Sequence, residues 1–449
     1  MLEMLSRIRE AVPTMLEGSV VRTVGLTAAV ADFPAPVGAV VEIERQPGEP
    51  LEAEVIGFRD ELTLLYPLRG MSGVRHGNRV RLARTSRMLP VGLELLGRVI
   101  DAHGKAIDGR PQPALPHRAA FDRRPPHALD RPPIDQPLTT GVRAIDGLLT
   151  CGKGQRMGVF AAAGVGKSVT LGMMARYTAA DVNVIALIGE RGREVNEFLE
   201  RDLGPEGLAK SVVVVATSDE PALVRVHAAL AATAVAEYFR DLGKDVLLLM
   251  DSVTRFALAQ REIGLAAGEP PTTRGFPPSV FAMLPKLVER AGRSALGSIT
   301  GFYSVLVEGD DPNEPVSDNV RSLLDGHTFL SRKMAGRGHY PAIDVLASLS
   351  RLMSSITDRG VQDAATTIRE ALSAYREHED LISIGAYRRG SNILVDVAME
   401  MREEIDKYLR QRVDEPTTVS RAQEELIALA RRCAQRRAAL QQGTASTAR

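Results

Sequence analysis

Apolar residues recur every three or four positions at the start of the chain, at Leu2, Leu5, Ile8, Val12, Met15 and Leu16. This spacing predicts a short amphipathic helix over residues 1–17. A helix of that length is marginally stable in water unless its apolar face packs on something. It therefore either folds back on its own domain or docks on a partner protein.

The pattern changes over residues 18–87 to short, partly alternating apolar runs: GAVVEIER, LEAEVIGF, ELTLLYPL and NRVRLAR, separated by Gly, Pro and Asp. Such runs predict a small all-β domain, either a barrel or a sandwich. Eight of the 26 prolines then fall within residues 111–137. We expect this segment to lie extended along a neighbouring domain, with a flexible linker as the alternative.

From residue 88 to 355, helix-like stretches alternate with near-continuous apolar runs: MGVFA, VNVIALIG, SVVVVAT, DVLLLMD and SITGFYSVLVEG. Strands buried on both faces have this composition, so we predict an α/β domain with a mostly parallel sheet. Residues 356–440 lack strand patterns and predict a helical C-terminal domain. Its last helix is expected to open with Ser420 and Gln423 in capping-box spacing. Residues 441–449 are expected to form a disordered tail.

Length, charge and cysteine content narrow the class of protein. The 449 residues suffice for about three domains. The 56 basic side chains equal the 56 acidic ones, so no bulk attraction to nucleic acid or to an anionic membrane is expected. The charged N-terminus is unlike a signal peptide, and no uncharged apolar run approaches the roughly 20 residues that span a bilayer. With only two cysteines, these features predict a cytoplasmic protein.

The stretch FAAAGVGKSVTLGMMARY, residues 160–177, connects an apolar run to a helix-like segment. Small residues and glycines leave backbone N–H groups accessible to phosphate oxygens, and a helix start adds its positive dipole end. The stretch matches G-x-x-x-x-G-K-[ST], except that Ala161 replaces the first glycine. We therefore predict an ATP-binding P-loop (a Walker A motif), in which Lys167 reaches the β- and γ-phosphates and Ser168 binds Mg²⁺. The residues predicted to contact ATP are Ala163, Gly164, Val165, Gly166, Lys167, Ser168 and Val169.

Carboxylates stand at the ends of two other predicted strands. DVLLLMD ends in Asp251, which is expected to hold the Mg²⁺ shell, or else only to cap the next helix. VNVIALIG leads into Glu190 within GERGRE. Because the carboxyl ends of parallel strands share one sheet edge, Glu190 is expected near the γ-phosphate, where it would polarise the attacking water. Arg191 would balance its charge; a surface ion-pair cluster over residues 190–194 is the alternative.

Six long motifs are spread over the chain: FAAAGVGKS, LIGERGREV, LLLMDSVTRFALAQREIGLAAGEPP, GFPPSVFAMLPKLVERAG, VEGDDPNEPVSDNVRSLLDGH and HYPAIDVLASLSR. Together they resemble the type III secretion ATPase family of injectisome and flagellar export ATPases. That family is similar to the catalytic β subunit of rotary ATP synthases. The resemblance covers the chain from about residue 18. LLTCGKGQR, FAAAG, VVVVATSDEPALVR and GDDPNEPVSD resemble the injectisome branch more closely, whereas LGMMARYTAADV is closer to the flagellar branch. We expect the injectisome branch.

The resemblance implies a RecA-like P-loop core and a homohexameric ring that binds nucleotide between neighbouring subunits. Mg-dependent ATP hydrolysis by this ring would energise protein export by releasing chaperones and unfolding substrates. Glu190 matches the catalytic carboxylate, Arg191 a γ-phosphate contact and Asp251 the Mg²⁺ carboxylate. Arg351, in LASLSR, matches an arginine finger donated to the adjacent subunit, and Tyr340, in HYPAID, matches the aromatic residue that packs on adenine.

The resemblance also implies several protein partners. Residues 267–279, AGEPPTTRGFPPS, match a loop that lines the central pore of the ring, where it would touch a central stalk protein. The N-terminal helix is expected to bind a stator or regulator protein, and the C-terminal domain to meet chaperone–substrate complexes. The ring is expected at the inner-membrane base of the export apparatus. No nucleic-acid partner is expected.

Three other readings fit parts of the sequence. A regulatory, non-catalytic nucleotide-binding subunit would lack the catalytic carboxylate, which Glu190 provides. A catalytic subunit of a proton-coupled ATP synthase is disfavoured only by the family details. A hexameric RNA helicase would need a basic, aromatic-lined N-terminal domain, but residues 18–85 hold only Phe33, Phe58 and Tyr66 as aromatics. Neither C-x-x-C nor H-E-x-x-H occurs, so no metal besides Mg²⁺ is expected.

Overall fold

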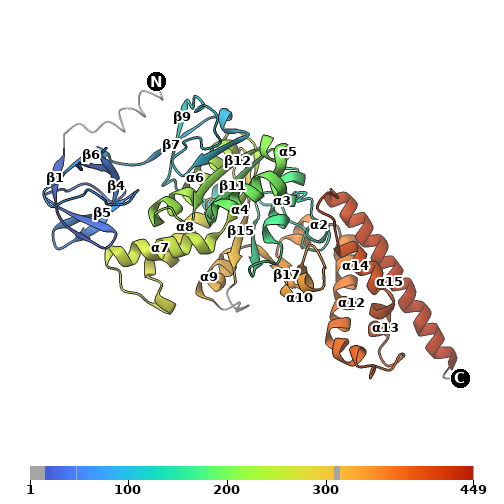
Figure 1. The fold of residues 1–449 in the computed structure, drawn as a ribbon. Helices are drawn as coiled ribbons and strands as arrows, with labels where there is room; N and C mark the ends of the chain where they lie inside the picture. Colours follow the sequence, from blue (N-terminus) through green and yellow to red (C-terminus); the bar gives the residue numbers. More distant parts are fainter. Residues whose placement is uncertain (1–15, 47, 308–313, 448–449) are drawn as a thin grey trace.

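The computed structural model describes residues 16–46, 48–307 and 314–447 of the chain. Three domains follow one another along it: a β-barrel, an α/β domain and a helical domain (Figure 1). The N-terminal helix predicted over residues 1–17 lies outside the described residues, apart from its end, where Glu17 already begins the first strand. The predicted fold class is confirmed.

The first domain is a closed barrel with the strand order β1-β2-β5-β4-β3-β6. Its strands are β1 (Glu17–Val24), β2 (Thr27–Ala31), β3 (Val40–Ile43), β4 (Leu51–Arg59), β5 (Leu62–Pro67) and β6 (Arg79–Arg84). Along β4, Leu51, Ala53 and Val55 are buried while the residues between them are partly exposed. Side chains from one face of each strand therefore fill the barrel interior. Because the sheet closes on itself, the first domain is a barrel and not a sandwich.

The segment after the barrel runs along the α/β domain. Strands β7 (Met88–Val91) and β9 (His117–Ala120) pair with each other, and short helical turns lie at η1 (Leu93–Leu95) and η2 (Ala128–Asp130). Within the proline-rich part, Arg131 donates hydrogen bonds to the carbonyls of Glu289 at 2.6 Å and Ala291 at 3.1 Å. The segment is therefore extended and anchored, as expected, rather than a flexible linker.

The central sheet has the order β17-β16-β10-β15-β13-β11-β12-β8, and β14 pairs with β15 beside this path. Its strands are β8 (Arg98–Asp101), β10 (Arg156–Ala161), β11 (Val182–Glu190), β12 (Ser211–Thr217), β13 (Asp245–Asp251), β14 (Gly292–Arg293), β15 (Ser298–Leu306), β16 (Gly326–Leu330) and β17 (Ile343–Ser350). All neighbours pair in parallel except β14 with β15 and β17 with β16. The edge strands β8 and β17, and β16 next to β17, were not predicted from the sequence because they are short or only half buried.

Helices cover both faces of this sheet, and a separate hydrophobic cluster fills each side. The helices of this domain are α2 (Arg143–Leu148), α3 (Lys167–Tyr177), α4 (Gly192–Glu197), the π-helix η3 (Phe198–Leu203), α5 (Gly204–Ala209), α6 (Ala222–Asp241), α7 (Val253–Ala267), η4 (Thr273–Gly275, in the loop between α7 and α8), α8 (Pro278–Val288), α9 (Pro315–Leu323), α10 (Arg332–Gly336) and α11 (Met353–Ile356). Among the described helices, α6 alone is long and apolar enough to cross a membrane, yet 83% of that stretch is buried inside the protein. It is placed as a core helix.

The C-terminal domain consists of α12 (Arg359–Ser383), α13 (Ile393–Glu400), α14 (Arg402–Leu409) and α15 (Val419–Thr447). Two sequence predictions were wrong here. The last helix starts before Ser420, and Thr418 Oγ1 accepts the hydrogen bond from Arg421 N at 3.3 Å, so Thr418 replaces Ser420 as the cap. The helix also continues through residues 441–447, where a disordered tail was predicted, because extending an existing helix fixes only one residue per added bond.

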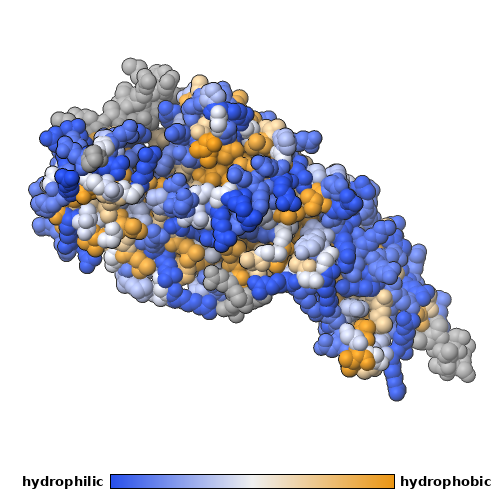
Figure 2. All heavy atoms as spheres, viewed as in Figure 1, coloured by the Kyte–Doolittle hydropathy of each residue, from blue (hydrophilic) through white to orange (hydrophobic). Residues whose placement is uncertain are grey.

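The surface of the C-terminal domain is mostly hydrophilic in the view of Figure 2, with an apolar patch at its far tip. Leu381 and Ile384, where α12 ends, are exposed large apolar residues at this tip. Exposed patches of this kind mark contact sites more often than isolated apolar residues do.

Candidate functional site

The turn between β10 and α3 has the backbone geometry that the P-loop prediction requires. Gly164 and Gly166 have φ of 79° and 89°, in the left-handed region that glycine adopts without steric cost. Gly166 is the N-cap of α3, so the unpaired N–H groups of the first helical turn face the loop. Val165 is buried and anchors the turn, whereas Ala163 and Ser168 are exposed. Backbone donors and a hydroxyl are thus presented together at the surface.

Three charged groups that are distant in sequence meet beside this turn. Strands β10, β15, β13 and β11 are neighbours and parallel, so their carboxyl ends lie at one edge of the sheet. Lys167 Nζ donates a hydrogen bond to Asp251 Oδ1, which also accepts one from Ser304 Oγ at 2.7 Å. Lys167 Nζ lies 3.9 Å from Glu190 Oε1. The structure therefore brings together the predicted phosphate, metal and catalytic residues.

The environment of Glu190 tunes its proton affinity. Burial, followed by the negative charge of Asp251, raises its pKa to about 7, although Lys167 and Arg255 act in the opposite direction. A carboxyl group with a pKa near neutrality changes protonation state readily at physiological pH. Glu190 is thus suited to polarise a water molecule or accept its proton.

Arg191 follows Glu190 in sequence but is largely exposed to solvent. Its side chain is 76% exposed and its guanidinium lies 3.9 Å from Glu194. The structure does not bring it into contact with Lys167, so its γ-phosphate role stays a prediction.

Arg255 is a site residue that the sequence reasoning missed. It lies in the first turn of α7, and its side-chain carbons lie 3.1–3.4 Å from where a Cβ on Gly189 would stand. Its buried Nε has no hydrogen-bond partner among the described residues. A half-buried cation beside Glu190 whose Nε lacks a partner among the described residues is equipped to bind an anionic oxygen. The signal was its place in SVTRF, directly after the strand that ends in Asp251.

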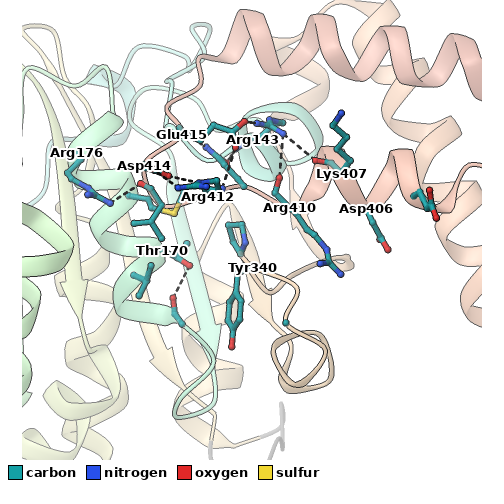
Figure 3. A pocket seen from close by; sticks show the side chains of 18 residues that line it. Arg143, Thr170, Arg176, Tyr340, Asp406, Lys407, Arg410, Arg412, Asp414 and Glu415 are labelled. Atoms are coloured by element: carbon teal, nitrogen blue, oxygen red, sulfur yellow. Dashed lines mark hydrogen bonds and ion pairs between the residues drawn. The ribbon is translucent and has the colours of Figure 1, made fainter.

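A cavity of about 1140 Å³ opens next to the P-loop (Figure 3). Its walls come from α3, from the loop containing Tyr340, and from residues 403–415 of the C-terminal domain. The ring of Tyr340 lies close to the P-loop, with two ring carbons 3.5 Å from where a Cβ on Gly166 would stand. Because Tyr340 is 47% exposed, its ring face is available for stacking on a planar base.

Residues 410–415 form a strap across the far side of this cavity. Gln411 anchors the strap: its Oε1 accepts from Arg143 N at 2.7 Å, its Nε2 donates to Gly141 O at 2.9 Å, and its N–H donates to Tyr340 O at 3.0 Å. Arg176 Nη2 donates to Val413 O at 3.0 Å. These lining residues were not predicted, since nothing in their local sequence indicates a nucleotide and only folding brings them to the P-loop.

Tyr340 precedes strand β17 and Arg351 follows it, so the two residues lie near opposite ends of the strand. Its start is level with the P-loop, because Ile343 pairs with Leu330 and Leu330 with Ala161. Its end is level with the start of β10, because Ser350 pairs with Gly326 and Gly326 with Met157. The six residues of β10 span about 20 Å. Arg351, which is exposed, therefore lies too far from its own P-loop to reach it.

The side chains at this edge fit a Mg²⁺ ion that is shared with a phosphate chain. No group of three or more His, Cys, Asp or Glu side chains that could cage a metal occurs within the described part of the chain. Mg²⁺ rarely uses such cages and is usually held by one or two carboxylates, waters and substrate phosphates. Asp251, buried and paired with the displaceable Lys167 ammonium, and Ser168, exposed at the helix start, supply that donor set.

Comparisons with known proteins agree with this geometry. Residues 141–350 match the ATP synthase alpha/beta family nucleotide-binding domain, and residues 357–428 match the T3SS EscN ATPase C-terminal domain. The flagellum-specific ATP synthase of Bacillus subtilis is 50% identical over 92% of this chain and 94% of its own length. The type 3 secretion system ATPase of Xanthomonas euvesicatoria is 52% identical over 89% of this chain and 90% of its own.

A solved structure of the assembled ATPase EscN from the enteropathogenic E. coli type III secretion system superposes with a TM-score of 0.86. It is 44% identical, and the match covers 92% of this chain and all of EscN. The fold and site thus define a P-loop ATPase of the ATP synthase type. The chain belongs to the family of type III secretion and flagellar export ATPases, and its relatives carry both names, so they do not confirm the expected injectisome branch.

Proposed function

We propose that the chain forms a homohexameric ring that hydrolyses Mg-ATP at sites shared between neighbouring subunits and so energises protein export. The position of Arg351 carries this proposal. Its strand places it about 20 Å from its own P-loop, at an exposed edge from which it can serve only a different copy. The assembled state of the related EscN supports the ring.

The chain's own side chains divide the work of hydrolysis. The P-loop N–H groups and Lys167 hold the β- and γ-phosphates, and Tyr340 stacks on the base. Ser168 and Asp251 would hold Mg²⁺, which supplies charge neutralisation on the phosphates when bound. Glu190 orients and polarises the attacking water, and Arg255 and a neighbour's Arg351 stabilise charge that develops on the γ-phosphoryl oxygens.

The test measures oligomeric state and hydrolysis in the same samples. Mass photometry over a protein dilution series, with and without Mg-ATP, gives the fraction of rings, and phosphate release gives the rate. We expect specific activity to follow the fraction of rings. A full rate from demonstrably monomeric protein contradicts the proposal.

A central stalk protein is proposed to contact the pore side of the ring. Residues 267–279 connect α7 to α8, and Glu269 Oε2 accepts a hydrogen bond from Ser279 N at 3.1 Å, which closes the loop at its base. The related EscN has been solved in complex with its central stalk EscO. Deleting residues 270–276 is expected to abolish stalk stimulation of hydrolysis while leaving basal hydrolysis in place.

We further propose that chaperone–substrate complexes meet the C-terminal domain at the tip that exposes Leu381 and Ile384. Replacing both by Ser should weaken chaperone pull-down without lowering ATPase activity. The segment of residues 1–16 is proposed to bind a stator protein at the cytoplasmic face of the inner membrane, which deletion and pull-down would test.

The injectisome branch is the proposed one, on the motifs LLTCGKGQR and VVVVATSDEPALVR. Deletion of the gene is then expected to stop secretion of effector proteins and leave motility intact. The converse phenotype assigns the chain to flagellar export.

A further inference from the structure

The segment that carries Tyr340 is bound to the C-terminal domain on both sides. Before Tyr340, helix α10 (Arg332–Gly336) and Arg337 face α12, where Glu379 accepts hydrogen bonds from Lys333 Nζ at 2.6 Å and Arg337 Nη1 at 2.7 Å. At Tyr340 itself, the backbone carbonyl accepts from Gln411 N at 3.0 Å. Two points of attachment thus come from the part of the chain after residue 355: one from helix α12 and one from the strap that contains Gln411.

Packing between α10 and α12 is incomplete. A cavity of about 560 Å³ lies between them and is lined by Lys333, Arg337, His339 and Glu379, among others. Inside it, the buried Nε2 of His339 has no hydrogen-bond partner among the described residues. Side chains that border empty or wet space lose the contacts that fix residues in a close-packed core. The ionic contacts of Glu379 therefore bridge a gap that apolar packing does not fill.

Glu379 is the common partner in this bridge. Its side chain is 17% exposed, whereas Lys333 and Arg337 are 64% and 56% exposed. A single exposed ion pair contributes little, but one covered carboxylate that accepts two charge-assisted bonds restrains both donors together. The donors stand four residues apart, on and just after α10, so their joint restraint fixes the direction in which the chain leaves toward Tyr340.

We propose that Glu379 is a positioning residue for nucleotide binding: by holding Lys333 and Arg337 it fixes the segment that presents Tyr340 to the base. This inference rests on the proposed role of Tyr340 in stacking on adenine. It makes the affinity for the base depend on a side chain of the C-terminal domain that touches neither nucleotide nor P-loop.

The test separates base binding from phosphate binding. Glu379→Gln keeps the size of the side chain but removes its charge. We expect KM for ATP to rise about three- to tenfold, part of the effect of losing a base–aromatic stack. The kcat should stay within about twofold, because the groups that act on the γ-phosphate are unchanged. Inorganic tripolyphosphate, which has no base, should inhibit the wild type and the variant with the same Ki.

Two further variants make the result specific. Asp380→Asn changes the neighbouring exposed carboxylate on α12, for which the described residues provide no side-chain partner, and should leave KM unchanged. Tyr340→Ala should raise KM at least as much as Glu379→Gln, and adding Glu379→Gln to it should cause no further rise, because residues that act through one another are not additive.

An unchanged KM in Glu379→Gln overturns the proposal. So does a matching rise in the Ki of tripolyphosphate, which indicates general damage to the site, or a full additional rise in the Tyr340→Ala background. If the wild type itself hydrolyses no ATP, the proposed function fails instead, and the two failures are thereby distinguished.

Discussion

Replacing Arg351 by Ala tests whether each site is built from two copies of the chain. The register of β17 places Arg351 at the start of β10 and the P-loop at its end, about 20 Å apart. An arginine that stabilises the charge of phosphoryl transfer is worth about 10³- to 10⁵-fold in rate, or roughly 4–7 kcal/mol of barrier. We therefore expect Arg351→Ala to lose hydrolysis by at least about a thousandfold while it binds nucleotide normally.

Mixed rings show whether the arginine acts on a neighbour. Arg351→Ala has an intact P-loop and catalytic carboxylate, and Glu190→Gln has an intact Arg351. When the two inactive variants are mixed and reassembled in equal amounts, roughly a quarter of the interfaces join an intact site to an intact arginine. Phosphate release should then reappear in the mixture, and fluorescent nucleotide binding should be normal in each variant alone.

The outcome that refutes the reasoning is specific. If the mixture forms rings, verified by mass photometry of differently tagged copies, and remains as inactive as each variant, then Arg351 does not serve a neighbouring site. Full activity of Arg351→Ala alone would equally remove the arginine from the mechanism.

Further predictions concern the site within one copy. Glu190→Gln should abolish turnover but keep ATP binding, measured by phosphate release and nucleotide fluorescence. Because the pKa of Glu190 is raised to about 7, its ionised form increases with pH, so wild-type kcat should rise from about pH 6 to about pH 8; a flat profile contradicts this. Arg255→Ala removes a cation that lowers the Glu190 pKa, so the profile should move to higher pH and kcat should fall. EDTA should stop hydrolysis, and Asp251→Asn should increase the Mg²⁺ concentration needed for half-maximal rate, whereas equal Mg²⁺ titrations would argue against Asp251 as a metal ligand.

Local sequence was sufficient to predict two kinds of site residue: those that form one continuous stretch of the chain, and those that stand at the end of a buried strand. The P-loop is recognisable because its small residues directly follow an apolar strand and precede a helix. Asp251 and Glu190 could be placed near it because parallel strands align their carboxyl ends at one edge. The same reasoning could have placed Arg255 near this edge, because it follows the strand that ends in Asp251. It was not predicted as a site residue because a single arginine on an amphipathic helix has no distinguishing local pattern.

The sequence by itself determined an all-β first domain, the parallel α/β core and the P-loop with the two carboxylates at strand ends, since hydrophobic periodicity and backbone-specific residues are local properties of the chain. Only the tertiary structure decided that the strap around Gln411 lines the cavity beside the P-loop. It also decided that Glu379 contacts the segment before Tyr340, and that Arg351 lies at the opposite end of β17 from the P-loop. These relations join residues far apart in the chain, and they depend on strand order and register, which no local pattern encodes.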